Sequence, residues 1–413
     1  MKIAVIGLGF VGLVTASALV DAGNEVIGID IDKEKISKIS RGVMPFFEPG
    51  LEKLFQRLQG RLAVSSDYSK IRGAEITFIV VPTPTVNDQI NLGYVFAAAK
   101  EICRINPKTI IVIKSTVVPG TAAKVAKLTG LNIISNPEFT REGSAVEDTL
   151  HPDRVIIGGK DIKAREAVEK IWAFTKAPTL ITSNENAEFI KYGSNSLLAT
   201  LISFGNELSD VVEKVPNADM ATIIAGMSFD KRIGCTGPYL KPGIGFGGSC
   251  FPKDTKALLA FSKTLGKEMN LIDAAIKTNE NRIDHVIDII TKNVKKPIAT
   301  TGIGVLGLAF KEDTDDLRES PSLKLIDRLK SIGVKVNVYD PLVKNIKIKG
   351  VKEFSSVDKL VDASDVVIIA TNSREFKKLN EMKITKLIID GRGFLEGKKF
   401  QRYVSIGRSA AQS

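Results

Sequence analysis

Histidine and cysteine are scarce in this chain. Its 413 residues include two histidines, His151 and His285, and three cysteines, Cys103, Cys235 and Cys250. Three thiols form no disulfide framework, so we expect a reducing compartment, the cytoplasm being the simplest. Neither residue type has the spacing of a metal site. We therefore expect no metal, interpret both histidines as structural, and assign acid-base chemistry to lysines, carboxylates and water.

Long apolar runs and aromatic-rich basic segments are also absent. No stretch approaches the roughly 18–20 apolar residues of a membrane span. A glycine pattern interrupts the apolar start, residues 1–23, which argues against a signal peptide. The net charge is +11, but the basic residues are scattered and aromatic residues make up 6% of the chain. We therefore expect neither a membrane nor a nucleic-acid partner, and we expect the positive field to attract small anionic ligands.

The first 30 residues carry a dinucleotide-binding pattern. Residues 2–7 are typical of a buried strand, the sequence GLGFVG (7–12) leads into a helix, and a second strand ends at Asp30, 18 residues after Gly12. In this context the glycines would let the backbone approach a pyrophosphate at the start of the helix. Asp30 would bond the ribose hydroxyls and repel a 2′-phosphate, which favours NAD over NADP. The alternative is a tight glycine turn without a ligand.

Strand and helix patterns extend this unit along the chain. Further strands are expected at 74–85, 109–116, 131–139 and 154–159, with helical patterns between several of them. That order predicts a doubly wound parallel sheet. From about Asn184 to Ile290 the apolar residues recur at helical spacing, which predicts a long helix and a helical middle domain.

The last third of the chain repeats the first in outline. A strand and turn contain Gly302, Gly304 and Gly307, and the next strand ends at Asp340. We predict an α/β fold with two Rossmann-like doubly wound parallel-sheet domains joined by a long helix and a helical middle domain. The predicted domains are residues 1–185, 186–295 and 296–413. The second glycine pattern is incomplete, so a nucleotide-linked substrate suits that crevice better than a second dinucleotide. Residues 407–413 are expected to be a frayed tail.

Cys250 lies in an unusual setting, the stretch GFGGSCFPKD (245–254). The glycines permit a turn and close backbone approach to a ligand, and Lys253 can favour the thiolate. We interpret Cys250 as reactive and Cys103 and Cys235 as inert; the alternative is a small buried hydrophobic residue. With a nicotinamide cofactor, such a thiol predicts oxidation of an aldehyde. The thiol adds to the aldehyde, hydride loss gives a thioester, and water releases a carboxylate.

At these residues the chain resembles the UDP-glucose/GDP-mannose dehydrogenase family. Beyond GLGFVG and GFGGSCFPKD, the resemblance rests on motifs spread over nearly the whole chain: VPTPT (81–85), KSTVVPGT (114–121), NPEFTREGSA (136–145), HPDRVIIGG (151–159), GLAFKEDTDDLRESPS (307–322) and DGR (390–392). It implies oxidation of the C6 alcohol of a nucleotide sugar to a carboxylate, with two NAD and one water. It also implies a helical dimer interface between two nucleotide-binding domains.

The resemblance leaves the sugar partly open. Residues 232–254 are most similar to members that oxidise UDP-glucose to UDP-glucuronate, but CTGPY (235–239) departs from the commoner form. The alternatives are GDP-mannose or a UDP-N-acetylhexosamine with the same chemistry. Two other classes are a two-electron hydroxyacid-type dehydrogenase, which would not need Cys250, and a catalytically silent NAD-binding regulator.

The resemblance also implies catalytic residues by position. Cys250 corresponds to the nucleophile, Lys191 and Asp254 to the pair beside the reacting carbon, Glu138 to the residue that assists thioester hydrolysis, and Thr116 to a water ligand. Asn195 follows Lys191 by four residues, on the same helical face. Two alternatives stay open: residues 138–142 as an ordinary capped helix start, and Lys191 on a solvated helix face. The division of acid-base roles is also open.

Two sets of binding residues complete the expectation. For NAD the matching positions are Gly7, Gly9, Phe10, Val11, Gly12, Asp30, Lys35, Thr83, Ser115, Glu142, Lys253 and Arg318. For the UDP-sugar they are Glu138, Phe139, Lys191, Asn195, Arg232, Tyr239, Lys241, Phe246, Gly247, Phe310, Lys311 and Arg392. Arg232 matches a position that reaches the sugar bound in the neighbouring subunit, which implies a homodimer with shared active sites.

Overall fold

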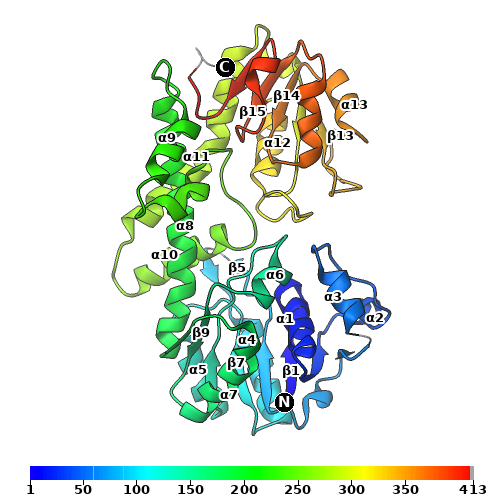
Figure 1. Cartoon of the computed structure of the whole chain (residues 1–413), viewed down its shortest axis with the longest axis vertical. Coiled ribbons are helices and arrows are strands. Elements are labelled where there is room, and N and C mark those ends of the chain that lie inside the picture. The colour runs from blue at the N-terminus through cyan, green and yellow to red at the C-terminus, as the bar shows by residue number, and fades with distance from the viewer. Residues whose placement is uncertain (59, 87, 410–413) are drawn as a thin grey trace. The chain divides into compact units, whose positions relative to one another are not determined.

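The chain divides into two compact units, Met1–Ser194 and Asn195–Ser413. A computed structural model describes residues 1–58, 60–86 and 88–409, and Figure 1 labels its helices and strands. The long helix α8 (Asn184–Val212) begins in the first unit and ends in the second. The three domain ranges expected from the sequence stay a prediction.

The first unit contains the predicted doubly wound sheet. Its described strands follow the order β10-β9-β8-β7-β4-β1-β2-β3. They are β1 (Lys2–Ile6), β2 (Glu25–Ile29), β3 (Ala63–Ser65), β4 (Ile76–Ile79), β7 (Ile110–Ile113), β8 (Ile133–Ser135), β9 (Val155–Gly158) and β10 (Thr179–Thr182). Neighbouring strands run parallel except β8 and β9, which are antiparallel, so the outer pair β9–β10 reverses the direction. The strand order changes direction between β1 and β4, where open α/β sheets bind ligands.

Helices alternate with these strands along the chain. They are α1 (Phe10–Asp21), α2 (Lys33–Ser40), α3 (Leu51–Arg57), α4 (Gly93–Ile105), α5 (Thr121–Thr129), α6 (Ala145–Leu150) and α7 (Ile162–Trp172). A short hairpin of β5 (Thr85–Val86) and β6 (Gln89–Ile90) follows β4. The predicted strand at 74–85 was therefore too long: β4 ends at Ile79, before Pro82 and Pro84, which have no N–H for a ladder.

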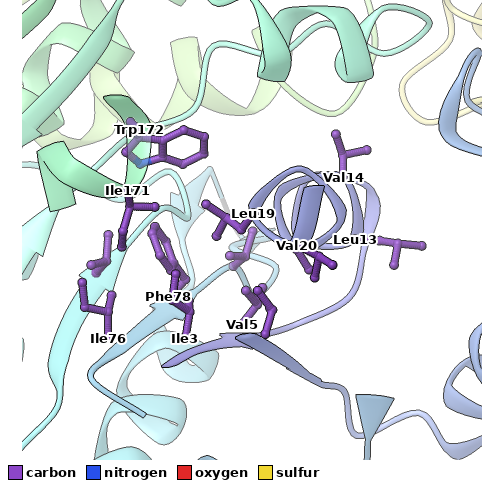
Figure 2. Packing of buried hydrophobic residues seen from close by; sticks show 14 of the residues in the cluster. Ile3, Val5, Leu13, Val14, Leu19, Val20, Ile76, Phe78, Ile171 and Trp172 are labelled. Atoms are coloured by element: carbon purple, nitrogen blue, oxygen red, sulfur yellow. The ribbon is translucent and has the colours of Figure 1, made fainter. Parts of the chain in front are cut away.

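The sheet of the first unit is buried on both faces. Successive residues of a strand point to opposite faces, so each strand contributes to two clusters. Ile3 and Val5 of β1 join a cluster with residues of α1 and with Trp172, as Figure 2 shows. Ala4 and Ile6 join the cluster on the opposite face, with residues of α4 and α5. This packing fixes the carboxyl ends of β1, β2, β4 and β7, which are followed by nine of the predicted cofactor residues: Gly7, Gly9, Phe10, Val11, Gly12, Asp30, Lys35, Thr83 and Ser115.

The second unit repeats the arrangement after a helical region. Its six described strands follow the order β13-β12-β11-β14-β15-β16, all parallel. They are β11 (Gly302–Leu306), β12 (Lys335–Tyr339), β13 (Val351–Glu353), β14 (Val366–Ile369), β15 (Leu387–Asp390) and β16 (Tyr403–Ser405), with helices α12 (Pro321–Ser331) and α13 (Val357–Asp362). This is the strand order of a Rossmann domain, so the predicted second Rossmann-like domain is confirmed.

Helices dominate the middle of the chain, as expected. After α8 come α9 (Met220–Ser228), the 3-10 helix η3 (Gly234–Leu240), α10 (Phe251–Thr264) and α11 (Asn270–Asn293). None of the helices in the described ranges combines the length and apolar composition that a membrane crossing requires.

The expectation of a frayed tail was wrong for residues 407–409. Gly407 donates its N–H to Glu213 and accepts from the N–H of Met220, and Ser409 donates to the carbonyl of Ala218. Arg408 forms an ion pair with Asp219. The segment thus docks on the turn between α8 and α9, a long-range contact that the local composition did not reveal. Residues 410–413 lie outside the described residues.

The turn between β1 and α1 yields a stability prediction for Gly12→Ala. A Cβ on Gly12 would lie 1.8 Å from the carbonyl oxygen of Gly7, which is backbone and cannot move aside cheaply. We expect the free energy of unfolding of the first unit to fall by about 3 kcal/mol or more. Denaturant unfolding followed by the fluorescence of Trp172, the single tryptophan, measures this because Trp172 belongs to the same core cluster.

The matched control is Gly9→Ala in the same turn. Gly9 has a φ of −72°, and nothing lies within 4 Å of the position that an added methyl group would take, so this variant should unfold at the wild-type midpoint. Equal midpoints for the two variants would contradict the packing argument.

Candidate active site

The three glycines of the first turn, Gly7, Gly9 and Gly12, lack a side chain for different physical reasons. Gly7 has a φ of +93°, and a Cβ there would lie 2.4 Å from the carbonyl oxygen of Val80. A Cβ on Gly12 would lie closer still, 1.8 Å from the carbonyl oxygen of Gly7. The fold therefore requires these two glycines with or without a ligand. Gly9 is exposed, and its surroundings are open. Because the fold does not explain Gly9, its lack of a side chain supports backbone approach by an anionic ligand at the start of α1.

Asp30, at the carboxyl end of β2, is held as a carboxylate. It accepts hydrogen bonds from the N–H of Leu8 (2.8 Å), the N–H of Asp32 (3.0 Å) and the ammonium of Lys35 (2.8 Å). Burial alone would raise the pKa of Asp30, but these donors outweigh it and hold the pKa below its ordinary value. An ionised Asp30 next to the ligand position would repel a 2′-phosphate, as expected for an NAD site. Phe10 and Val11, also expected at this cofactor, form the first turn of α1.

Thr83 and Ser115 connect the loop after β4 with the loop after β7. Strand β4 borders the point where the strand order changes direction. The Thr83 hydroxyl donates to the carbonyl of Thr116 (2.9 Å), and the Ser115 hydroxyl donates to the carbonyl of Val81 (2.8 Å). Their hydroxyl protons are thus committed to the backbone, so towards a ligand each oxygen acts as an acceptor. Thr116 itself is half-buried at the carboxyl end of β7.

Glu138 and Lys191 form a buried ion pair in the first unit. The ammonium of Lys191 lies 2.8 Å from Glu138 Oε1, and the side chains are 4% and 7% exposed respectively. Glu138 Oε2 accepts from the N–H (2.7 Å) and hydroxyl (2.5 Å) of Thr140. Burial raises the pKa of Glu138, but Lys191 and Thr140 together lower it below its ordinary value. The sequence alternative of a solvated Lys191 was therefore wrong.

The segment around Glu138 is a loop. Helix α6 starts at Ala145, so a helix start at 138–142 was also wrong. The ring of Phe139 lies 4.0 Å from the guanidinium carbon of Arg154 and 5.4 Å from Lys191 Nζ. Glu142, expected at the cofactor, is half-buried in this loop.

Glu48, from a distant loop, secures the end of the same segment. Its two carboxylate oxygens accept the N–H groups of Gly143 (2.8 Å) and Ala145 (2.7 Å). These contacts fix the backbone directly after Glu142. The sequence analysis missed Glu48 because the contact spans more than 90 residues of chain.

In the second unit, the glycines before Cys250 pack against protein atoms. A Cβ on Gly247 would lie 2.2 Å from the carbonyl oxygen of Glu319, and one on Gly248 would lie 2.6 Å from the ring of Phe310. Gly245 and Gly248 also have positive φ values of +114° and +83°. The close approaches described here are therefore to the chain itself, rather than to the ligand that the sequence suggested.

Asn279 of α11 fixes the same loop. Its side-chain amide accepts from the N–H of Phe246 (2.6 Å) and donates to the carbonyl of Phe246 (3.0 Å). These two bonds satisfy the backbone of Phe246 as the backbone of a paired strand would. The ring of Phe246 is buried and meets Phe251 edge-on. Its contact with a substrate, and that of Gly247, stay predictions. Asn279 was also missed, because an asparagine within a helical pattern carries no local signal.

Cys250 precedes the first residue of α10 and is half-buried. Its Sγ lies 3.6 Å from the hydroxyl oxygen of Ser249. A helix start presents unpaired N–H groups and the positive end of the helix dipole, which favour a thiolate. Lys253 was also expected to favour the thiolate; its ammonium lies 2.5 Å from Asp254 Oδ1, and its effect on the thiol stays a prediction. The start of α10 is a second local feature that would favour the thiolate.

Asp254 brings two predicted residues together in the second unit. Its carboxylate is fully buried, and it accepts hydrogen bonds from Asn195 (2.5 Å) and Lys253 (2.5 Å). Asn195 follows Lys191 by one turn of α8. A buried carboxylate with two donors is rigidly oriented, which suits a group that receives a proton directly or through water.

The second Rossmann-like domain keeps the turn, but in its described residues no α-helix starts directly after it. Asp340 accepts from the N–H groups of Leu308 (2.7 Å) and Ala309 (3.3 Å), as Asp30 accepts from Leu8. However, Ala309 stands where the first turn has Gly9, and α12 does not begin until Pro321. The described turn therefore presents no helix start next to β11 for a pyrophosphate.

The remaining predicted residues occupy separate parts of the second unit. Lys311 Nζ lies 5.9 Å from the Phe310 ring, Arg318 pairs with Asp316, and the Arg392 Nε donates to the carbonyl of Ala370 (2.9 Å). Burial lowers the pKa of Arg392, although Glu312 and Asp390 oppose the shift.

Three further predicted substrate residues lie in the helical region. Arg232 is highly exposed and pairs with Asp230. Tyr239 is half-buried in η3, and Lys241 is exposed just after it. Neither the fold nor the contacts of the described residues test these ligand contacts.

Comparisons with known proteins agree with this geometry. Three family models of the UDP-glucose/GDP-mannose dehydrogenase family match the chain: the NAD binding domain (residues 1–176), the central domain (185–281) and the UDP binding domain (304–397). The chain is 40% identical over 437 residues to the UDP-glucose 6-dehydrogenase TuaD of Bacillus subtilis, covering 100% of this chain and 94% of that protein.

Solved structures give the same result. A UDP-glucose dehydrogenase from Pyrobaculum islandicum superimposes with a TM-score of 0.91 at 33% identity, covering 98% of each chain. A UDP-D-ManNAc dehydrogenase from Pyrococcus horikoshii superimposes with a TM-score of 0.89 at 30% identity over the whole of both chains. The chain is thus an NAD-dependent oxidoreductase and belongs to the UDP-glucose/GDP-mannose dehydrogenase family.

Proposed function

We propose that the enzyme oxidises UDP-glucose at C6 to UDP-glucuronate, with two NAD and one water per sugar. The observation that carries the proposal is the thiol of Cys250 at the start of α10, in a loop fixed by glycine contacts and Asn279. A two-electron alcohol dehydrogenase has no use for such a thiol. The open turn at Gly9 and the carboxylate of Asp30 would hold NAD, which would supply the hydride acceptor for both oxidation steps.

The chain's own residues account for the remaining events. Asp254 receives the proton of the C6 alcohol, directly or through water. The Cys250 thiolate then adds to the aldehyde carbon, and Lys191 stabilises the negative oxygen that forms. Hydride loss from this alkoxide re-forms the carbon–oxygen double bond and leaves a thioester on Cys250. Water attacks the thioester carbon, the carbon–sulfur bond breaks, and the carboxylate and thiolate separate while the two protons of the water pass to solvent. Glu138 orients that water together with Thr116.

The identity of the sugar rests on relatives. The curated relative in Bacillus subtilis is named a UDP-glucose 6-dehydrogenase, whereas the Pyrococcus horikoshii structure is named a UDP-D-ManNAc dehydrogenase. A UDP-N-acetylhexosamine is therefore the second candidate. A panel of nucleotide sugars that includes GDP-mannose, compared by kcat/KM, separates them.

We further propose a homodimer formed through α8. Leu197, Phe204 and Val211 are large apolar residues, 60%, 48% and 61% exposed, and they recur every seven residues. A seven-residue repeat of apolar side chains is typical of the contact line between two helices that pack side by side. Arg232 is exposed in the same unit, close in sequence to Phe229, which is also exposed. This exposure supports a role for Arg232 in the active site of the partner subunit.

Limiting UDP-glucose should yield two equivalents of NADH with the wild-type enzyme. Cys250→Ser should reduce formation of the acid by at least about 10³-fold, because the oxygen nucleophile cannot replace the thiolate. Absorbance of NADH and chromatography of the product measure both. Cys103→Ser, whose Sγ lies against the carbonyl of Thr129, is the control and should act like wild type. A serine variant with the wild-type rate would refute the thioester route.

Gly9→Ala should weaken NAD binding without loss of stability. The added methyl has no protein neighbour within 4 Å but would stand where the pyrophosphate approaches α1. We expect the Kd for NAD to rise about tenfold or more, measured by calorimetry. Gly226→Ala in α9, a glycine with equally open surroundings, should leave the Kd unchanged. An unchanged Kd for Gly9→Ala would place the cofactor elsewhere.

Mixing two inactive variants tests the shared site. If Arg232 acts in the partner subunit, dimers that combine Arg232→Ala with Cys250→Ser contain one complete site. After subunit exchange an equal mixture should regain about one quarter of wild-type activity. Adding Phe204→Glu to both variants should prevent the recovery and give monomers in light scattering. No recovery in a mixture shown to contain mixed dimers would mean that Arg232 acts within its own subunit.

A further inference from the structure

Lys114 is a buried lysine that the sequence analysis passed over. It lies just after β7, directly before Ser115, and is 6% exposed. Its ammonium donates to Asn136 Oδ1 (3.3 Å) and lies 4.5 Å from the centre of the Trp172 ring. Burial of a lysine is costly unless the surroundings compensate its charge, so its retention next to the Glu138 segment calls for a role.

The contacts around the Lys114 ammonium are themselves fixed. The amide of Asn136 donates to the carbonyl of Ile156 (2.8 Å), which turns its oxygen towards Lys114. Trp172 meets Phe78 edge-on at 6.3 Å within the core cluster drawn in Figure 2. The carbonyl dipole and the ring face both favour a cation at this point.

The charge balance of the site depends on Lys114. Glu138 and Lys191 form a close pair with no net charge, and the field of such a pair falls off steeply with distance. An ionised Lys114 adds one unit of positive charge to the buried group. Burial lowers the pKa of Lys114 to about 8, with Glu138 raising it and Lys191 lowering it.

We infer that Lys114 is a positioning residue: its buried ammonium, held by Asn136 and Trp172, supplies a net positive charge beside the Glu138–Lys191 pair and so favours negative charge on the reacting oxygen. This inference rests on the proposed function, because the charge acts on the thioester step. The interaction is mutual: the carboxylate of Glu138 favours the charged form of Lys114, and the charged form of Lys114 favours the ionised form of Glu138.

The pH dependence has a definite sign. Lys114 is mostly protonated at pH 7 and loses its charge as the pH rises through about 8. The rate should therefore fall on the alkaline side. Glu138 and Lys191 are the charged groups that act on Lys114 most directly. Glu188 of α8 also titrates near neutral pH, since burial raises its pKa to about 7, although the N–H groups of Gly120 and Ala122 oppose the shift.

The first test needs no catalysis, because Trp172 is the single tryptophan and lies over the ammonium. Removing a unit charge at this distance changes the field on the indole and hence its emission. We expect wild-type fluorescence to change with a midpoint near pH 8. Lys114→Met should abolish the transition, whereas Glu188→Gln and Lys124→Met, an exposed lysine of α5, should keep it. A wild-type emission that is flat between pH 7 and 9.5 and equal to that of Lys114→Met would overturn the inference, because the indole would then face no ammonium charge.

The second test uses steady-state kinetics with UDP-glucose. Lys114→Met should lower kcat about 10- to 100-fold at pH 7 with little change in KM. Lys114→Arg keeps the charge at all working pH values, so it should retain more activity than the methionine variant and lose the alkaline limb near pH 8. Lys124→Met should match wild type.

The outcomes separate this inference from the proposed function. A wild-type enzyme that makes no NADH from any sugar of the panel refutes the proposed function, and the fluorescence titration still decides whether Lys114 titrates as inferred. An active wild-type enzyme whose Lys114→Met variant keeps the full rate and pH profile refutes the role of Lys114 alone. If the methionine variant does not fold, the arginine variant and the wild-type titration give the answer.

Discussion

The buried ion pair of Glu138 and Lys191 is the interaction on which the active site of the first unit depends. Two opposite charges away from water are stable only when paired and hydrogen-bonded, and Thr140 supplies the remaining bonds. The pair connects the loop after β8 to helix α8. The ion pair also affects the chemistry that Glu138 can perform. The pKa of Glu138 is held below its ordinary value, which fits the proposed role in orienting water better than a role as general base.

The two Rossmann-like domains show how one framework serves two ligands. In both, an aspartate at the end of the second strand binds the turn after the first strand, Asp30 at Leu8 and Asp340 at Leu308. In both, the first glycine of the turn has a positive φ and lies against a backbone carbonyl. The two domains differ in the segment after that glycine. An open Gly9 at a helix start suits a pyrophosphate. In the second domain Ala309 takes that position and a long loop precedes α12, so no helix start faces a ligand at the turn.

Sequence reasoning succeeded where the determinants are local. The spacing from Gly12 to Asp30 predicted the first nucleotide-binding turn, and the glycines before Cys250 predicted the turn that precedes α10. It failed where the partner is remote in sequence. The docking of Gly407 on Glu213, and the clamp of Asn279 on Phe246, join segments that no short pattern relates. Lys114 escaped notice because a lysine after an apolar strand is usually interpreted as solvated, and only the arrangement of Trp172 and Asn136 shows otherwise.

The ion pair of Lys253 bears on how the proposed reactivity of Cys250 would arise. Lys253 is paired with Asp254, so at the sulfur these two charges largely cancel. The start of α10 then adds a local positive potential at the sulfur, which supports the proposed thiolate. The ammonium of Lys114, in contrast, titrates, because burial lowers its pKa to about 8. If Lys114 acts as inferred, loss of its charge slows the thioester step above neutral pH and gives the enzyme an alkaline limit.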